Sequence, residues 1–386
     1  MHDNPSAAVG KRPSDILASS RRPETLGSVL EGAVSLAMGE PYFTTPAPII
    51  DAAVSALTKG NTRYEALTGS PRLREAIASD LSRRAGNSIR ASEVVPTHGA
   101  SAGLGAVILA VVNPGDRVVI PEPTYSLYAD QVAMAGGVVK WVPTRIDGSL
   151  DMDALAEAIP GAKLTILCNP GNPSGHVLTA GDVRAVVELV ARSGRLVLSD
   201  EAYCDIVFDG RTFFSALELR EFSDHVVVSR TFSKSFAMTG WRLGYVVASE
   251  RVAAAVGLVH RSLNGALNSF VQEAALAALA LPEKYYQDMV AQYTIRRDLV
   301  VDQLTGIDEV ELATPQGAFY AFPRVKSNLN SDELTTRMAA AGVLVRSGRE
   351  YGPTGEGHFR ISFATDMESL TRGMARVVSV LTKELR

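Results

Sequence analysis

A lysine surrounded by hydroxyl groups is the feature of this sequence with the clearest chemical meaning. Residues 226–245 begin with three valines, which is typical of a buried strand. Thr231 and Ser233 then precede Lys234, and Arg242 follows eight positions after the lysine (242 − 234 = 8). An amine can condense with an aldehyde, while hydroxyls and a guanidinium bind phosphate. The stretch predicts a Schiff-base lysine beside a phosphate site; a solvated loop lysine beside a structural arginine is the alternative.

The elements that must position this lysine follow a regular alternation. Short apolar runs each end in a polar or glycine-containing signature, and a helical stretch follows most of them. The runs cover residues 93–96, 118–120, 138–142, 164–168, 196–198 and 226–228. This pattern predicts an α/β fold with a mostly parallel sheet flanked by helices. Ligands of such sheets bind at the carboxyl ends of the strands, so we expect the polar signatures to converge on one rim.

The signatures, in this order and spacing, resemble those of the class I and II aminotransferases, the fold-type I enzymes that use pyridoxal phosphate (PLP). Thr231, Ser233, Lys234, Gly240 and Arg242 fit the cofactor-lysine pattern of that family. Position 231 is more often serine or glycine there, so the threonine is a mild departure. The resemblance implies an aspartate-aminotransferase-like fold and a reaction that moves an amino group between an L-amino acid and a 2-oxo acid.

The resemblance also implies a domain division. It places a large PLP-binding domain at residues 46–285 and a smaller α+β domain at residues 286–386. Residues 1–45 are expected to form an irregular arm that contributes to the smaller domain. Helical patterns are expected over residues 249–304, with Pro282 as a break.

Several cofactor contacts are implied as well. Gly99, Ala100 and Ser101 lie at a strand-to-helix junction, where backbone N–H groups and the helix dipole favour a phosphate. Asp200 ends an apolar strand, where burial needs a cationic partner such as a protonated pyridine nitrogen; a helix N-cap is the alternative. Tyr203 matches a residue that hydrogen-bonds the ring's phenolate oxygen and joins Lys234 and Asp200 as a catalytic candidate.

Further residues match family positions around the ring and the substrate. Asn172 matches a second partner of the phenolate oxygen, and Tyr125 the aromatic that stacks on the ring. Gly39 matches a glycine that leaves room for substrate, and Arg360 the arginine that binds the substrate carboxylate bidentately. Tyr64 matches a tyrosine that crosses a homodimer interface to the partner's cofactor phosphate. Each of these residues has a plain packing, turn or surface role as its alternative.

Composition limits the class of protein. The 386 residues are 46% hydrophobic and carry a net charge of −4, so no basic surface for nucleic acid is indicated. No window approaches the ~20 apolar residues of a membrane helix. Cys168 and Cys204 lack metal-site spacing and are expected to be reduced. We expect a cytoplasmic enzyme without a metal.

The motifs leave other functions open. A lyase, decarboxylase or oxidative deaminase of the same fold would share them, because they do not determine which bond at Cα breaks. A non-catalytic PLP-binding sensor domain is a further alternative. The amino donor and oxo acceptor do not follow from the sequence. A dicarboxylic substrate would need a second cation, for which Arg21, Arg22 and Arg261 are candidates.

Overall fold

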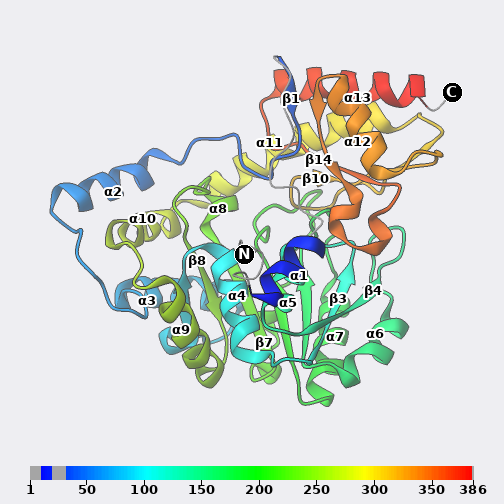
Figure 1. The fold of residues 1–386 in the computed structure, drawn as a ribbon. Helices are drawn as coiled ribbons and strands as arrows, with labels where there is room; N and C mark the ends of the chain where they lie inside the picture. Colours follow the sequence, from blue (N-terminus) through cyan, green and yellow to red (C-terminus); the bar gives the residue numbers. More distant parts are fainter. Residues whose placement is uncertain (1–9, 20–31, 385–386) are drawn as a thin grey trace, which may run out of the picture.

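A seven-stranded sheet forms the centre of the molecule (Figure 1) in the computed structural model, which describes residues 10–19 and 32–384. The spatial order is β2-β8-β7-β6-β5-β3-β4, and β8 alone runs antiparallel to its neighbours. The strands are β2 (Val94–Thr97), β3 (Arg117–Glu122), β4 (Val138–Pro143), β5 (Leu164–Cys168), β6 (Leu196–Asp200), β7 (Val226–Thr231) and β8 (Gly244–Val247). The expected mostly parallel sheet is confirmed.

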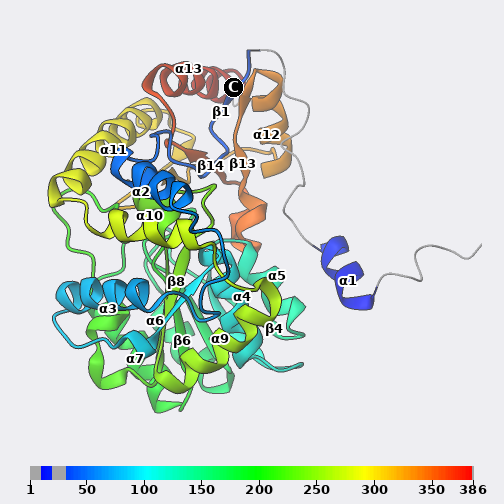
Figure 2. The same ribbon diagram turned by 90° about the vertical axis from the view of Figure 1, so that its left-hand side faces the viewer.

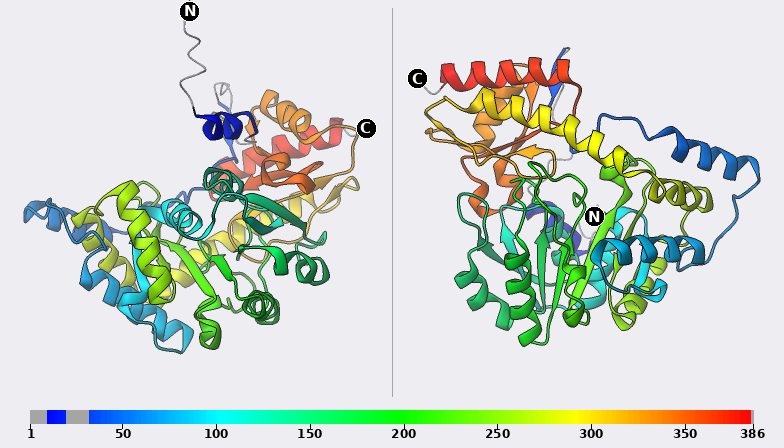
Figure 3. Two further views of the ribbon diagram at one scale, coloured as in Figure 1. Left: turned by 60° about the horizontal axis from the view of Figure 1, so that its bottom comes forward. Right: turned by 180° about the vertical axis from the view of Figure 1, so that it is seen from behind.

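Helices cover both faces of this sheet (Figure 3), as its apolar strands require. Val118 and Ile120 of β3 pack in a cluster with residues of α4 (Gly99–Val111), α5 (Leu127–Met134) and α9 (Glu250–Asn264). Val119, between them in the sequence, belongs to the opposite cluster. That cluster includes residues of α6 (Met152–Ala158) and α7 (Ala180–Arg192).

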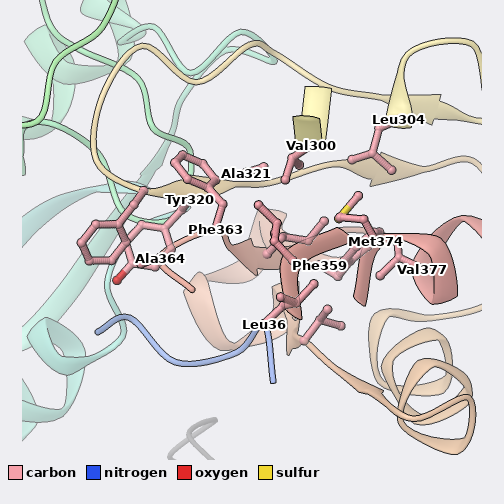
Figure 4. Packing of buried hydrophobic residues seen from close by; sticks show 14 of the residues in the cluster. Leu36, Val300, Leu304, Tyr320, Ala321, Phe359, Phe363, Ala364, Met374 and Val377 are labelled. Atoms are coloured by element: carbon pink, nitrogen blue, oxygen red, sulfur yellow. The ribbon is translucent and has the colours of Figure 1, made fainter. Parts of the chain in front are cut away.

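The C-terminal part forms a second, α+β unit, and the chain segment before residue 36 contributes a strand to it. Its helices are α11 (Glu283–Leu304), α12 (Ser331–Ala340) and α13 (Met367–Glu384). Its strands are β1 (Val34–Ser35), β9 (Val310–Glu311), β10 (Tyr320–Ala321), β11 (Arg324–Val325), β12 (Val343–Leu344), β13 (Arg346–Ser347) and β14 (Phe359–Ser362). Strand β1 pairs with β12. Figure 4 shows the core of the unit, where Leu36 approaches Phe359, Met374 and Val377. The proposed domain boundaries stay a prediction.

The structure corrects two expectations about helices. The expectation of an irregular arm is wrong for residues Lys11–Ser19. These residues form helix α1, which contacts α5. The helical stretch before α11 is also broken between α9 and α10 (Ser269–Leu279), because α9 ends at Gly265 with a φ of 73°. Figure 2 shows α2 (Ala47–Thr58) along α10, with α3 (Pro71–Ala85) below them. The short α8 (Phe232–Ser235) carries the lysine.

Candidate active site

A cavity of about 310 Å³ lies at the carboxyl ends of the parallel strands, where the polar signatures were expected to converge. Six of the predicted residues enter it from the segments after β2, β3, β5 and β6. They are Ala100, Ser101, Tyr125, Asn172, Asp200 and Tyr203. Since these four strands end at one edge of the same sheet, segments that are far apart in the sequence become neighbours here.

Six more predicted residues come from the lysine segment and from outside the sheet. They are Gly39, Thr231, Ser233, Lys234, Arg242 and Arg360. Gly99 lies directly behind Arg242: a Cβ added to it would stand 2.5 Å from the Nη2 of Arg242. Tyr64 is the exception, since it is 96% exposed and does not line the cavity of this chain.

Lys234 reaches into the cavity from the one-turn helix α8. Its Nζ donates a hydrogen bond of 2.6 Å to the carbonyl oxygen of Gly39. Burial lowers the pKa of this amine to about 8, and the positive charge of Arg360 adds to the effect. A larger fraction of the amine is therefore neutral near pH 8 than for an ordinary lysine, and the neutral amine is the nucleophile. Gly39 has to be a glycine, because a Cβ would overlap the Tyr320 hydroxyl.

Asp200 provides a buried negative charge at the end of β6. Its Oδ2 accepts a 2.7 Å hydrogen bond from the Tyr128 hydroxyl, and its Oδ1 accepts one of 3.2 Å from the backbone N–H of Ala202. Burial raises the pKa of Asp200 to about 6 despite these bonds. Both donors are neutral, so the carboxylate fits a ligand that brings a positive charge, such as a protonated ring nitrogen.

The opposite end of the cavity is built for an anion. Ser233 and Thr231 are linked by a 2.9 Å hydrogen bond between their hydroxyls. Arg242 has a φ of 55° and donates through Nη1 to the carbonyl oxygen of Thr239. The amino terminus of the 13-residue helix α4 faces the same space through Ala100 and Ser101. Hydroxyls, a guanidinium and free helix N–H groups together are the chemistry that holds a phosphate.

Arg360 forms a third polar centre. It donates to Asn172 Oδ1 at 3.0 Å and to the carbonyl oxygen of Ala37 at 2.6 Å, and its guanidinium lies 4.2 Å from the ring centre of Tyr320. Its Nε is buried and has no hydrogen-bond partner among the described residues. A buried donor without a partner costs free energy, so this arginine is suited to receive a carboxylate.

The sequence reasoning missed several residues of the cavity. Tyr128 lies inside a helix, and Tyr320 bonds the Tyr203 hydroxyl at 2.8 Å without belonging to any motif. Arg346 and Glu350 also line the cavity. The pairing of β13 with β14 places Arg346 in the cavity wall. Because β13 has only two residues, the sequence gives no signal for this pairing. As for the suggested second cations, Arg261 is exposed on α9, and positions 21 and 22 lie outside the described residues.

Two searches of the described part of the chain bear on other functions. None of its helices has the length and apolar character needed to cross a membrane. Among the same residues, no cluster of three or more histidine, cysteine or acidic side chains is placed to hold a metal ion. Cys168 and Cys204 are free cysteines.

Comparison with known proteins identifies the group of proteins that this chain resembles. The family model described as aminotransferase class I and II matches residues 31–377. An aspartate aminotransferase of Pyrococcus horikoshii is 32% identical over 364 residues, covering 92% of this chain and 93% of that protein. Aromatic-amino-acid aminotransferase 2 of Thermococcus litoralis is 35% identical over 370 residues, covering 93% and 94%. The crystal structure of the Thermotoga maritima aspartate aminotransferase superposes with a TM-score of 0.89 at 30% identity, covering 97% of this chain and all of that one.

Proposed function

Because the chain belongs to the class I and II aminotransferases, we propose that it binds PLP through Lys234 and uses the cavity to move an amino group between an amino acid and a 2-oxo acid. The observation that carries the proposal is the position of the Lys234 amine. It is partly buried, its pKa is lowered to about 8, and it lies in one cavity with the carboxylate of Asp200 and the guanidinium of Arg360.

The cofactor-binding residues form two groups, one for the phosphate and one for the ring. Ala100, Ser101, Ser233 and Arg242 hold the phosphate, and Thr231 orients Ser233 through its hydroxyl. Gly99 leaves space for the Arg242 guanidinium.

At the other end, Asp200 keeps the ring nitrogen protonated, because its buried charge is stabilised by a cation. Tyr203 and Asn172 would hydrogen-bond the phenolate oxygen, and Tyr125 would pack on the ring. When bound, PLP supplies an aldehyde for the lysine and a ring that absorbs the electrons released at Cα.

The remaining residues act on the substrate. Arg360 holds the α-carboxylate with a paired hydrogen bond, which orients the bond between Cα and its hydrogen. Gly39 leaves room beside the cavity for the Tyr320 hydroxyl, because it carries no side chain. The Nζ of Lys234 would take the proton from Cα and return it later in the reaction. An amine with a pKa near 8 suits both directions of that transfer near neutral pH.

A homodimer completes the proposal. Tyr64 is 96% exposed, and the sequence near it carries further exposed apolar side chains, namely Ile50, Val54 and Leu57 on α2 and Leu67. Large exposed apolar side chains in one region of the surface are typical of protein interfaces. We propose that this surface meets a second copy and that Tyr64 contacts the partner's cofactor phosphate.

The substrate side chain does not follow from family membership. One relative named above is an aspartate aminotransferase and another acts, by its name, on aromatic amino acids. A cytoplasmic location stays part of the proposal, and the two free cysteines support it.

Replacing Lys234 by alanine tests the central assignment. The variant should lose the yellow colour of the PLP-bound protein and its transaminase activity, because no amine remains to link the cofactor or move the proton. Lys284→Ala, which removes an exposed lysine on α11, is the matched control. In the unaltered protein, borohydride reduction and peptide mapping should place the pyridoxyl group on Lys234. A label on a different lysine would contradict the assignment.

A further inference from the structure

Arg346 stands beside Arg360 in the cavity wall. The two residues are Cα partners in the antiparallel pairing of β13 with β14, and both line the cavity. Directly opposed residues of antiparallel strands project from the same face, with Cβ atoms about 4.5–5.5 Å apart. The wall therefore presents two neighbouring guanidinium groups, one more than a single α-carboxylate requires.

Glu350 is the counter-ion of this second guanidinium. The Nε of Arg346 lies 3.1 Å from Oε2 of Glu350, four residues further along the chain. The Arg346 side chain is 18% exposed and that of Glu350 is 7% exposed, so a ligand in the cavity reaches the arginine more readily. A guanidinium has five N–H donors, and Nε carries one of them. The pair with Glu350 thus neutralises the charge of Arg346 at Nε. The outer edge of the Arg346 guanidinium, formed by the two Nη atoms, can still bind a ligand.

The segment that carries both residues is tied to the central sheet. The backbone N–H of Thr124 donates to the carbonyl oxygen of Tyr351 at 2.7 Å. The carboxylate of Glu122 accepts two hydrogen bonds of 2.9 Å from the backbone N–H and the hydroxyl of Thr354. A group that is already held in place loses little entropy when it binds a ligand, so Arg346 is preorganised.

We propose that Arg346 is a specificity-determining residue whose Nη edge binds a second anionic group on the substrate, a carboxylate or a phosphate ester, while Glu350 stays paired with its Nε. The inference rests on the proposed function, because it takes Arg360 as the site of the α-carboxylate. A basic side chain would have to bind Glu350 instead. That carboxylate is the more buried of the two and already faces Arg346.

Selectivity between isosteric substrates tests this role. The ratio of kcat/KM for L-glutamate to that for L-glutamine is measured in the PLP-bound enzyme and in Arg346→Gln. Loss of a charge-assisted bidentate contact should lower the ratio about 10- to 100-fold. Glu350→Gln should raise it, because the carboxylate that neutralises Arg346 is gone. Arg349→Gln is the matched control, since it removes the same charge from an exposed side chain that pairs with Asp332. Its ratio should equal that of the unaltered enzyme.

Binding of non-reacting acids gives a second readout that needs no turnover. Calorimetric titration of the PLP-bound enzyme should show that glutarate binds more tightly than butyrate, and Arg346→Gln should remove that preference. Titration with 4-phosphonobutyrate separates the two sources of charge: tighter binding than glutarate indicates a phosphate ester, and weaker binding a carboxylate.

The outcomes separate this inference from the proposed function. If no amino acid is transaminated, the proposed function fails. If neutral amino acids react but the glutamate-to-glutamine ratio and the glutarate preference are unchanged in Arg346→Gln, this inference alone is overturned. A preference of the unaltered enzyme for L-lysine over L-norleucine that is lost in Glu350→Gln would also overturn it, since Glu350 would then be the selecting group.

Discussion

The buried carboxylate of Asp200 lowers the free energy of unfolding of the cofactor-free protein. Burial raises its pKa from 3.8 to about 6, so the folded protein binds this proton more tightly than the unfolded chain does. For an acid with a raised folded pKa, stability is lost as pH rises through the interval between the two values and stays lost above it. The shift corresponds to about 3 kcal/mol of the free energy of unfolding above pH 6.

We therefore expect Asp200→Asn to stabilise the cofactor-free protein. At pH 8 the gain in the free energy of unfolding should be about 1–3 kcal/mol, because the buried charge is gone while an acceptor remains for the Tyr128 hydroxyl. At pH 5, where the carboxyl is mostly protonated, the gain should be smaller. Urea unfolding of the cofactor-free variant and unaltered protein at both pH values measures it.

The control for that experiment is Asp302→Asn on the exposed side of α11, which should show no difference between the two pH values. In the PLP-bound form, Asp200→Asn should instead lower the free energy of unfolding, because the variant loses the charge that holds the ring nitrogen protonated. A destabilisation of the cofactor-free Asp200→Asn protein by the same amount at pH 5 and pH 8 would show that the buried charge is not the cause.

Residues that lie in motifs could be placed from the sequence, and residues that lie in regular elements could not. Lys234 and Asn172 follow strands directly, where polar groups interrupt apolar runs. Tyr128 is the second residue of helix α5, and nothing in the neighbouring sequence distinguishes it from a packing residue. Arg346 enters the cavity only through pairing with a strand twelve residues or more away, which residue spacing does not reveal.

At the scale of elements, the length of an apolar run decided how well it was predicted. Strand β5 has the expected bounds, Leu164–Cys168, because its residues are almost all apolar and buried on both faces. Strands β9, β11 and β13 were not predicted, since each has two residues and contains a charged one. Such short strands exist because neighbouring segments fix them, and local propensity carries no signal for that.

The start of helix α4 gives an element-scale prediction. Gly99 has a φ of 76°, and a Cβ there would lie 2.5 Å from Nη2 of Arg242. Gly99→Ala should therefore displace the Arg242 guanidinium and tilt the N–H groups that hold the phosphate. We expect the dissociation constant of PLP to rise about tenfold or more, together with a stability loss of about 1–2 kcal/mol from the left-handed backbone. Absorbance titration of the cofactor-free variant measures the affinity.

A control substitution at a second glycine with positive φ distinguishes the effect of backbone strain from the effect on the cofactor site. Gly194 has a φ of 64°, and a Cβ there would meet no atom within 4 Å. Gly194→Ala should lose a similar amount of stability and keep its affinity for PLP. Equal affinity for PLP in the two variants would mean that the amino terminus of α4 does not hold the phosphate.

At the scale of the whole molecule, the cavity is assembled from segments that span the chain. Lys234 and Arg360 meet at the segment that follows β1, where Lys234 donates to the carbonyl oxygen of Gly39 and Arg360 to that of Ala37. Tyr64 does not meet them, and it is almost fully exposed in one chain. The proposed homodimer gives this tyrosine a place, with each site taking Lys234 from one chain and Tyr64 from the other.

Complementation between two defective chains tests that sharing. Lys234→Ala should be inactive, and Tyr64→Ala should bind PLP weakly and turn over slowly. In a heterodimer of the two, isolated with different affinity tags, one site combines the intact Lys234 of one chain with the intact Tyr64 of the other. Two-fold symmetry makes the second site doubly defective, so the heterodimer should have about half the kcat of the unaltered dimer. If Tyr64 served its own chain, the site with Lys234 would lack it, and the heterodimer would be no more active than half of the Tyr64→Ala dimer.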